Sequence, residues 1–464
     1  MTAPARLVSA AIVVAALASA CTQDEPALDR DALLALSPGA SPAVPPDVSN
    51  RVADDPRAAA WGQVLFFDAG FSGMLLDSDN DGFHDGVGLQ GETGKVSCAS
   101  CHVPADGFVD TRTRFGQISL ASGWTRRRSP SVLDVGHATL LMWDGRFDSL
   151  QRQVLGVIES PLEANSSRLF FAQEIARRYG AQYEEIFGSD PTVVLGEDYP
   201  QLTGDTTGCQ LELTSFTTPD PECSEGTLHG VPGDRAEYDS LTAEQQRTVT
   251  RIAMNAGRAI AAYERLLSCG TSRFDDFMHG DEGALDESEQ RGAALFVGKA
   301  DCVSCHSGTF FSDQEFHNVG LAPATVAAAF LLGVDDPGAA MGLETVSSDP
   351  LNVAGEFSDG NDGRIPESVG AEMLGAFRTP MLRCVSRRPS FMHIASLRTL
   401  REVVEFFDAG GHVRSDAPAP DGFVGKSELV PLGLSERQKD DLVAFLEALE
   451  GEGPADELLD QPSQ

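Results

Sequence analysis

Basic residues are scarce in this chain of 464 residues. It holds 34 lysines and arginines against 70 aspartates and glutamates, which gives a formal net charge of −36. So much negative charge repels phosphate backbones and anionic lipid headgroups, and this excludes nucleic-acid binding as a main activity. A basic or neutral protein partner would be attracted to such a surface, but simple solvation of an acidic protein explains the excess equally well.

Long apolar runs are nearly absent. The run at residues 7–17 is too short to span a bilayer, and it follows a single positive charge and precedes small residues, as in a secretory signal. Because the signal ends on Cys21, it resembles a bacterial lipoprotein signal, with a plain periplasmic signal as the alternative. We therefore predict a signal over 1–21 and a periplasmic protein with a lipid anchor at the outer membrane. The Pro-, Ala-, Ser- and Asp-rich residues 22–56 predict a flexible tether.

Cysteines are few as well, and four of the nine lie in two copies of one motif. Residues 97–102 read SCASCH, and residues 302–306 read CVSCH. A Cys-x-x-Cys pair alone would also fit zinc or a redox dithiol, but only a c-type haem needs the adjacent histidine. The thiols add to two vinyl groups, and the imidazole reaches the iron. The sequence thus predicts two covalently bound haems, held by Cys98, Cys101 and His102 and by Cys302, Cys305 and His306.

Four cysteines remain after the haem cysteines and Cys21 are subtracted. An even number in an oxidising compartment indicates two disulfides. Pairing Cys209 with Cys223 would close a short loop, which leaves Cys269 to pair with Cys384. The other connectivities stay open at this point.

Most of the apolar patterning has a helical period. Apolar residues recur on one face over 150–158, 249–263 and 442–449, while long alternating patterns are scarce. The two haem motifs also share a preceding Gly-x-x-Leu-Phe pattern. We therefore expect a mainly α fold of two tandem cytochrome c-like domains. Their predicted limits are 57–239, with an inserted loop at 195–239, and 240–450, followed by an acidic tail at 451–464.

Further motifs link the chain to a known family. The most diagnostic stretch is WDGRFDSLQRQ at 143–153, followed by Glu163, and other matches are RFD at 273–275, FRTPMLR at 377–383 and FMH at 391–393. With these motifs, the region 61–449 resembles the bacterial di-haem cytochrome c peroxidases. The resemblance extends to their relatives that oxidise partner proteins, such as the methylamine dehydrogenase maturation enzyme.

The resemblance implies roles for particular residues. The N-terminal haem would react with hydrogen peroxide, and the C-terminal haem would pass on electrons through Trp143. Gln153 and Glu163 would line the distal pocket, where a carboxylate can take a proton from one peroxide oxygen and return it to the other. The electron source would be a small donor protein, a cytochrome c or a copper protein. The alternatives are a peroxide-dependent oxidase that acts on a partner protein, and a non-catalytic electron carrier or haem sensor.

The sequence departs from this family at both haems. Classical members have a histidine on the loop after the first motif, but residues 103–136 contain none, and Ser122 aligns with its place. We therefore expect an open sixth position on the first haem, and a packing role for His137. At the second haem the usual methionine or tyrosine ligand aligns with Phe407, which cannot bind iron. That haem is then five-coordinate, or a nearby side chain substitutes; the candidates are Met381, Met392, His393 and His412.

A third departure concerns calcium. The family's calcium ligands align with Arg128 and with residues 388–390, and a guanidinium there argues against a metal. We hypothesise that Arg128 or Arg388 instead bridges carboxylates or haem propionates. A different calcium site is predicted in the loop that begins at Asp77, although Gly88 replaces the usual last glutamate. Its candidate ligands are Asp77, Asp79, Asp81 and Asp85.

Overall fold

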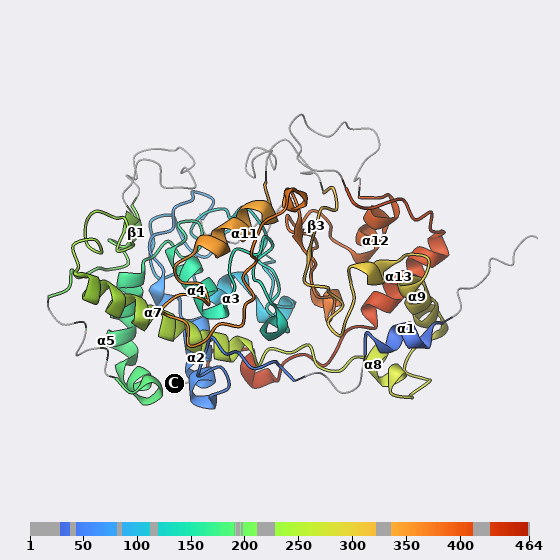
Figure 1. Ribbon diagram of the computed structural model, residues 1–464, viewed down its shortest axis with the longest axis horizontal. Coiled ribbons are helices and arrows are strands. Elements are labelled where there is room, and N and C mark those ends of the chain that lie inside the picture. The colour runs from blue at the N-terminus through green and yellow to red at the C-terminus, as the bar shows by residue number, and fades with distance from the viewer. Residues whose placement is uncertain are drawn as a thin grey trace, which may run out of the picture.

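The computed structural model is mainly helical, as expected, with two short two-stranded sheets among the residues it describes (Figure 1). These are residues 28–462, apart from 38–42, 81–85, 112–118, 190, 192–194, 196–197, 211–227, 322–335 and 412–426. The sheets pair β1 (Gly208–Cys209) with β2 (Leu228–His229) and β3 (Phe316–His317) with β4 (Phe377–Arg378), both antiparallel. No helix within the described ranges is both long and apolar enough to cross a membrane.

The helices fall into two sets along the long axis of the molecule (Figure 1). The first set is α2 (Pro56–Phe67), α3 (Cys98–Cys101), α4 (Leu150–Glu159), α5 (Arg168–Phe187) and α7 (Ala243–Glu264). The second set is α8 (Arg273–Met278), α9 (Glu287–Val297), α12 (Leu400–Asp408) and α13 (Glu436–Glu447). Two further helices are α1 (Arg30–Leu34) and α11 (Ala339–Ser348).

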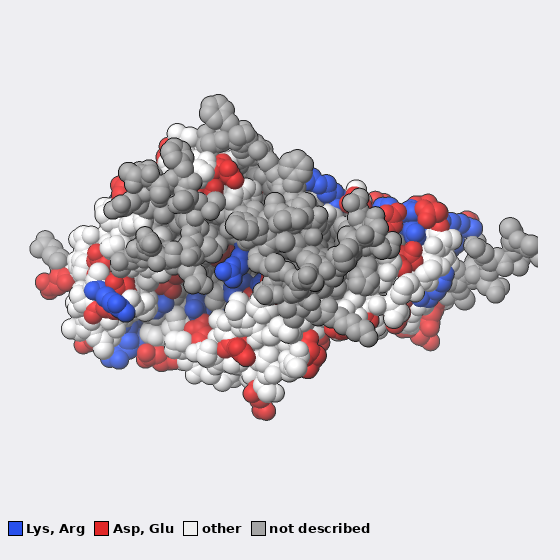
Figure 2. Space-filling model, turned by 90° about the horizontal axis from the view of Figure 1, so that it is seen from above, with Lys and Arg blue, Asp and Glu red and all other residues white. Residues whose placement is uncertain are grey.

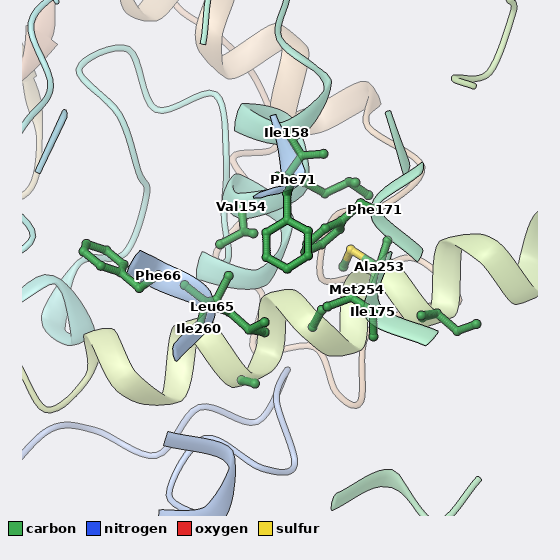
Figure 3. Close-up of a cluster of buried hydrophobic side chains, with 14 of the residues drawn as sticks. Leu65, Phe66, Phe71, Val154, Ile158, Phe171, Ile175, Ala253, Met254 and Ile260 are labelled. Carbon is green, nitrogen blue, oxygen red and sulfur yellow. The ribbon is translucent and has the colours of Figure 1, made fainter. Parts of the chain in front are cut away.

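Helices α2 and α7 cross closely at Gly62 in the first unit. A Cβ atom there would collide with the carbonyl oxygen of Ala259, so only glycine permits this approach. Beyond the crossing, Phe66 packs edge-on against Tyr263 with ring centroids 5.2 Å apart. The core around this crossing is apolar and continuous with α4 and α5, as Figure 3 shows. The first motif follows α2 and is thereby held against a rigid helix pair.

Helices α9 and α13 repeat the arrangement in the second unit. A Cβ atom at Gly292 would collide with the carbonyl oxygen of Asp441, and Phe296 packs edge-on against Phe445 at 5.3 Å. The Gly-x-x-Leu-Phe pattern that precedes both haem motifs is therefore the signature of one helix crossing, used twice.

The repeat extends beyond the helix crossings at a constant offset of 250 residues. A 3₁₀ turn over Val135–His137 corresponds to one over Val385–Arg387. Each is followed by an antiparallel bridge, Leu141 with Phe147 and Phe391 with Leu397. The methionine after each bridge's first residue has positive φ, 68° at Met142 and 70° at Met392. The chain is thus a tandem duplication in structure as well as in motif.

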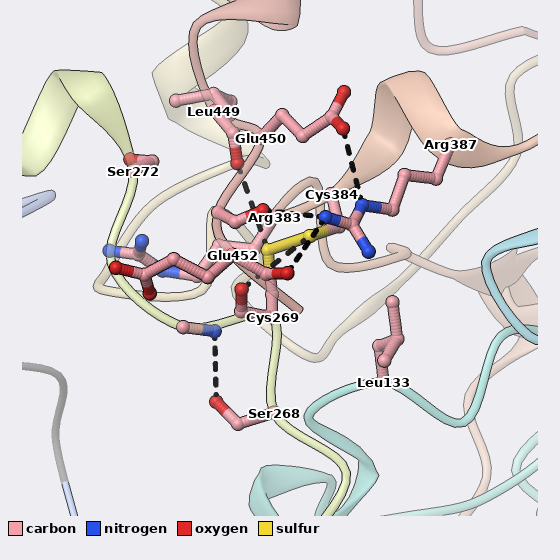
Figure 4. The surroundings of a disulfide bond; sticks show 12 residues. Leu133, Ser268, Cys269, Ser272, Arg383, Cys384, Arg387, Leu449, Glu450 and Glu452 are labelled. Atoms are coloured by element: carbon pink, nitrogen blue, oxygen red, sulfur yellow. Dashed lines mark hydrogen bonds and ion pairs between the residues drawn. A yellow bond between two sulfur atoms is a disulfide. The ribbon is translucent and has the colours of Figure 1, made fainter. Parts of the chain in front are cut away.

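A disulfide between Cys269 and Cys384 joins the two units, which confirms that predicted pair (Figure 4). The backbone N–H of Cys384 also donates to the carbonyl oxygen of Leu449, so the end of the second unit is fixed at the same point. Cys209 is disulfide-bonded too, and its expected partner Cys223 lies outside the described residues.

The predicted boundary at 239/240 is wrong. Helix α7 packs on α2, α4 and α5 and so belongs to the first unit, and the boundary falls in the connection after it. In the sequence, a helix with one apolar face looks the same whether it ends the first domain or begins the second. Only its contacts in the structure assign it to the first unit. The tail at 451–464 also returns to the first unit, where Gln63 donates to the carbonyl oxygens of Glu457 and Asp460.

The predicted tether at 22–56 is corrected as well. Helix α1 lies within it, and Leu33 and Leu36 are fully buried in the core of the second unit. Further on, Asn50 is buried and donates to the carbonyl oxygen of Arg258 in the first unit. A mostly polar segment can dock through a few apolar residues, because the core of the second unit supplies the apolar surface on which they pack.

Candidate functional site

The first motif forms helix α3, a single turn that begins after the N-cap Ser97. Cys98 and Cys101 lie one turn apart on it, and they do not form a disulfide. Two thiols that are one helical turn apart lie on the same side of the helix, where both can reach one edge of a planar group. The second motif is a 3₁₀ turn whose two cysteines, Cys302 and Cys305, likewise form no disulfide.

Both motif histidines are held in the same way. His102 donates from Nδ1 to the carbonyl oxygen of Phe108 at 3.2 Å, and His306 donates to that of Phe311 at 2.8 Å. Burial lowers the pKa of both imidazoles, so both are neutral near pH 7. A metal-binding histidine commonly donates its second ring nitrogen to a carbonyl oxygen, which leaves Nε2 for the metal. Cysteines that form no disulfide, neutral imidazoles and fixed tautomers together fit covalent haem at both motifs.

The first motif borders a cavity of about 420 Å³. This volume is in the range of cofactor pockets in proteins. The cavity brings together the side chains that the sequence predicted from distant positions; Cys98, Cys101, His102, Trp143, Gln153 and Glu163 all line it. The constellation inferred from the motifs is therefore one site in space.

Glu163 lies on the short connection between α4 and α5. Its carbonyl oxygen accepts from the N–H of Ser122 at 3.0 Å, and its own N–H donates to Ser160. Burial raises the pKa of the Glu163 carboxyl, an effect that nearby Arg146 opposes. A buried carboxyl with a raised pKa can hold or release a proton close to neutral pH.

Gln153 and Trp143 approach the cavity from different elements. Gln153 is on α4, with its Nε2 atom 3.8 Å from the sulfur of Met142. Trp143 is buried, and its indole N–H donates to the carbonyl oxygen of Arg128 at 2.7 Å. The Trp143 ring also meets His393 of the second unit edge-on, with centroids 6.2 Å apart. Trp143 thus spans the distance from the first cavity to the second unit.

An ion-pair network at the cavity wall was not predicted from the sequence. Arg127 forms ion pairs with Asp144 at 2.5 Å and with Asp336 at 2.6 Å, and Arg146 also pairs with Asp144. All four residues line the cavity. The Asp-Gly-Arg stretch was visible in the motif at 143–153, but the network also needs Arg127 and Asp336, which lie about 200 residues apart.

Glu264 was missed too. It ends α7, is buried, lines the cavity, and its Oε2 atom has no hydrogen-bond partner. Burial raises the pKa of this carboxyl to about 8, so the group is mostly neutral at pH 7. The feature of the sequence that could have indicated it is a single carboxylate directly after the apolar helix face at 249–263.

Ser122 and His137 do not supply a ligand from the loop after the first motif. Ser122 is fully buried, its hydroxyl lacks a hydrogen-bond partner, and it does not line the cavity. His137 stacks on Phe310 with centroids 3.9 Å apart, which is the packing role expected for it.

The residues considered as ligands of the second haem are spread out. Phe407 is half-buried on α12 and packs against the second core, as does Met392. Met381 is buried, and His393 stacks on Phe377 at 3.7 Å beside Trp143. His412 lies outside the described residues. The structure does not identify any of these side chains as the ligand of the second haem. The missing ligand expected at Phe407 stays a prediction.

The second motif also borders a cluster of potential metal ligands. Cys305, Asp313 and His317 place one ligand atom each within 4.8 Å of one another, the one such group found among the described residues. His317 contacts Asp313 and Glu428, both at 3.0 Å. Since Cys305 is the expected haem thioether, this cluster does not form a separate metal site.

The calcium predictions have different outcomes. Asp77 accepts from the N–H of Asp79, and Asp79 accepts from the indole of Trp124 at 2.8 Å, while Asp81 and Asp85 lie outside the described residues. That site stays a prediction. At the other position, Arg128 donates to the carbonyl oxygen of Ser390 at 2.6 Å, so its partner there is a backbone oxygen rather than a carboxylate.

Comparison with known proteins agrees with this site. A family model described as di-haem cytochrome c peroxidase matches residues 56–203. Cytochrome-c peroxidase IdrP1 of Denitromonas iodatirespirans is 29% identical over 440 residues, which cover 94% of this chain and 91% of that protein. Methylamine utilization protein MauG of Methylorubrum extorquens is 29% identical over 405 residues, which cover 86% of this chain and 80% of that protein.

The fold has a counterpart among solved structures. The diheme peroxidase BthA from Burkholderia thailandensis matches with a TM-score of 0.53 at 22% identity, over 86% of this chain and 87% of that one. This likeness concerns the fold. The sequence matches show that the chain is similar to di-haem cytochrome c peroxidases over most of its length, and it is thus a di-haem cytochrome c peroxidase-like oxidoreductase.

Proposed function

We propose that this protein reduces hydrogen peroxide at its N-terminal site with electrons that arrive through its C-terminal site. Each turnover takes two electrons and two protons and releases two water molecules. The observation that supports this proposal is the single cavity that Glu163, Gln153 and Trp143 share with the first haem motif. A carrier that only passes electrons has no use for a buried carboxyl at its open face.

The bound haem would supply the iron that binds and cleaves the peroxide O–O bond. Glu163 takes the proton from the near oxygen and returns it to the departing one, and Gln153 orients the peroxide through its amide. Trp143 conducts electrons between the units, since its ring lies between the first cavity and His393. Aromatic contact across the interface shortens the path that an electron must travel.

The proposed function also needs a source of electrons. We propose a small electron-donor protein, a cytochrome c or a copper protein, and the alternative is a partner protein whose side chains are oxidised. On the visible face of Figure 2, acidic side chains are scattered among basic ones, and the described residues there form no single acidic patch. Turnover assays with peroxide and either a reduced donor protein or a protein substrate separate the two possibilities.

Export belongs to the same proposal. Covalent c-type haem is attached outside the cytoplasm, and the disulfide between Cys269 and Cys384 fits an oxidising compartment. We propose a periplasmic protein with a lipid on Cys21; the signal at 1–21 lies outside the described residues. Mass spectrometry of the mature N-terminus tests this assignment.

Stopped-flow spectroscopy of the fully oxidised protein mixed with peroxide tests the peroxidase proposal. We expect a high-spin N-terminal haem that reacts without prior reduction, because the loop after the first motif offers no histidine. A spectrum of low-spin, bis-histidine haem alone, with turnover appearing only after reduction, contradicts the proposal.

A further inference from the structure

Three arginines lie between the two haem sites without a carboxylate partner. Arg128 and Arg388 are buried, and in each the Nε atom has no hydrogen-bond partner. Arg128 donates from Nη1 to the carbonyl oxygen of Ser390, and Arg388 donates from Nη2 to that of Met381. Arg378 donates to the side-chain oxygen of Gln314 at 3.2 Å. All of these partners are neutral.

Other buried arginines in the described chain are paired with acids. Arg127 binds two aspartates, Arg168 binds Glu159 at 2.5 Å, and Arg383 binds Asp275 at 2.7 Å. A buried cation without an opposite charge is unfavourable, because it loses hydration and gains no ion pair. The three unpaired arginines are thus exceptions within this protein.

Arg388 repels both of the other guanidinium groups. Burial, and after it repulsion by Arg388, lowers the pKa of Arg128 to about 9. Burial likewise lowers the pKa of Arg388 to about 10, with Arg378 adding to the effect. Asp110 and Asp134 attract Arg128 and Arg388 respectively, but neither forms an ion pair with them. The cluster therefore has a surplus of positive charge.

Its location connects it to both sites. Arg128 and Arg378 line the first cavity, and Arg388 donates to the carbonyl oxygens of Met381 and Arg383 in the second unit. The backbone keeps the cluster in place by a reciprocal pair of bonds across the units. The N–H of Arg128 donates to the carbonyl oxygen of His393, and the N–H of Arg378 donates to that of Trp143, both at 2.8 Å.

These arginines need carboxylates, and a haem carries two propionates on the edge away from its vinyl groups. Guanidinium and carboxylate form short, charge-assisted hydrogen bonds, commonly in bidentate pairs. We propose that Arg128, Arg378 and Arg388 form one anion site that binds the propionates of the two haems, with Arg128 and Arg378 serving the first. The positive cluster also favours the reduced haem and so raises its midpoint potential. This inference rests on haem attachment at both motifs and not on peroxide turnover.

The test measures midpoint potentials and propionate vibrations in the holoprotein. Haem content is first confirmed at two per chain, and a lower content would count against the proposed function as well. In Arg128→Gln and Arg378→Gln we expect a lower midpoint potential for the first haem and shifted propionate bending bands in resonance Raman spectra, with axial ligation unchanged. Lysine at either position should restore part of the potential.

Arg168→Gln is the matched control, since it removes a buried arginine of the first unit that does not line the cavity. Shifts in Arg128→Gln and Arg378→Gln no larger than those in this control would overturn the proposal. If the variants fail to incorporate haem, a crystal structure of the wild-type holoprotein decides. Propionate oxygens within hydrogen-bond distance of the guanidinium groups support the proposal, and propionates bound only by water or other residues refute it.

Discussion

The two cytochrome units share a scaffold but differ on the inner faces of their sites. Helices α4 and α12 are equivalent at the 250-residue offset, so Gln153 corresponds to Val403 and Val157 to Phe407. Trp143 corresponds in the same way to His393. The first unit thus has a polar amide at Gln153 where the second has an apolar side chain, and an indole at Trp143 where the second has an imidazole. On the proposed function, the duplicated framework would hold a haem in each unit, and a few substitutions would direct the peroxide chemistry to the first.

The largest effect is expected when the two cysteines of one haem motif are replaced together. Cys98→Ser with Cys101→Ser should lower the haem content from two to one and abolish the reaction with peroxide. Cys302→Ser with Cys305→Ser should lower the haem content equally but keep the single-turnover reaction with peroxide. Pyridine haemochrome assays and stopped-flow spectra measure both effects. Peroxide reactivity surviving in the first variant would reverse the assignment of the sites.

Glu163→Gln tests whether the carboxyl in the first cavity is needed for peroxide cleavage. We expect peroxide cleavage to slow by about 10²- to 10⁴-fold, because the proton acceptor is lost, while the haem spectra stay nearly unchanged. Glu185→Gln, on the exposed surface, is the control. An undiminished rate in Glu163→Gln would show that this carboxyl only packs.

The pH dependence of the wild type gives an independent check on Glu163. Burial raises the pKa of this carboxyl, and only the deprotonated form can accept a proton. The rate of peroxide cleavage should therefore fall as the pH drops through a pKa above the usual value for glutamate. This step should be absent in Glu163→Gln, and a step that persists there would belong to another group such as Glu264.

The two glycine crossings test how far the scaffolds are equivalent. Gly62→Ala and Gly292→Ala each place a methyl group against a carbonyl oxygen of the partner helix. Each should lower the free energy of unfolding by roughly 1–3 kcal/mol, measured by chemical denaturation. Gly283→Ala is the control, because it meets no backbone atom within 4 Å. A large loss at one crossing only would mean that the units differ in packing as well as in chemistry.

The smallest effect is expected at Phe407. If this ring faces the second iron, Phe407→Tyr should add a phenolate-type ligand and Phe407→Met a thioether, each changing the optical and magnetic spectra of one haem. Val157→Met is the matched change at the equivalent position of the first unit. Spectra identical to those of the wild type in both Phe407 variants, with the second haem already low-spin, would show that another side chain binds the iron.

The haem motifs and the helix crossings could be predicted from the sequence because their information is local. Two thiols and a histidine within five residues define one chemical site wherever they fold. The Gly-x-x-Leu-Phe pattern likewise specifies a close helix crossing, because only glycine allows it and the aromatic ring completes it. The roles of Trp143 and Glu163 were predicted only through the family resemblance; the structure places both residues at one cavity.

Only the tertiary structure decided which distant groups meet. Residues 28–37 and 43–56 look like a linker in composition, yet they dock because a core elsewhere accepts Leu33 and Leu36. The sequence pointed to Arg128 and Arg388 as candidate bridging residues, but Arg378 joins them in one cationic cluster only because the two units meet there. Charge pairing and burial depend on every neighbour in space, and most of those neighbours lie far away in the sequence.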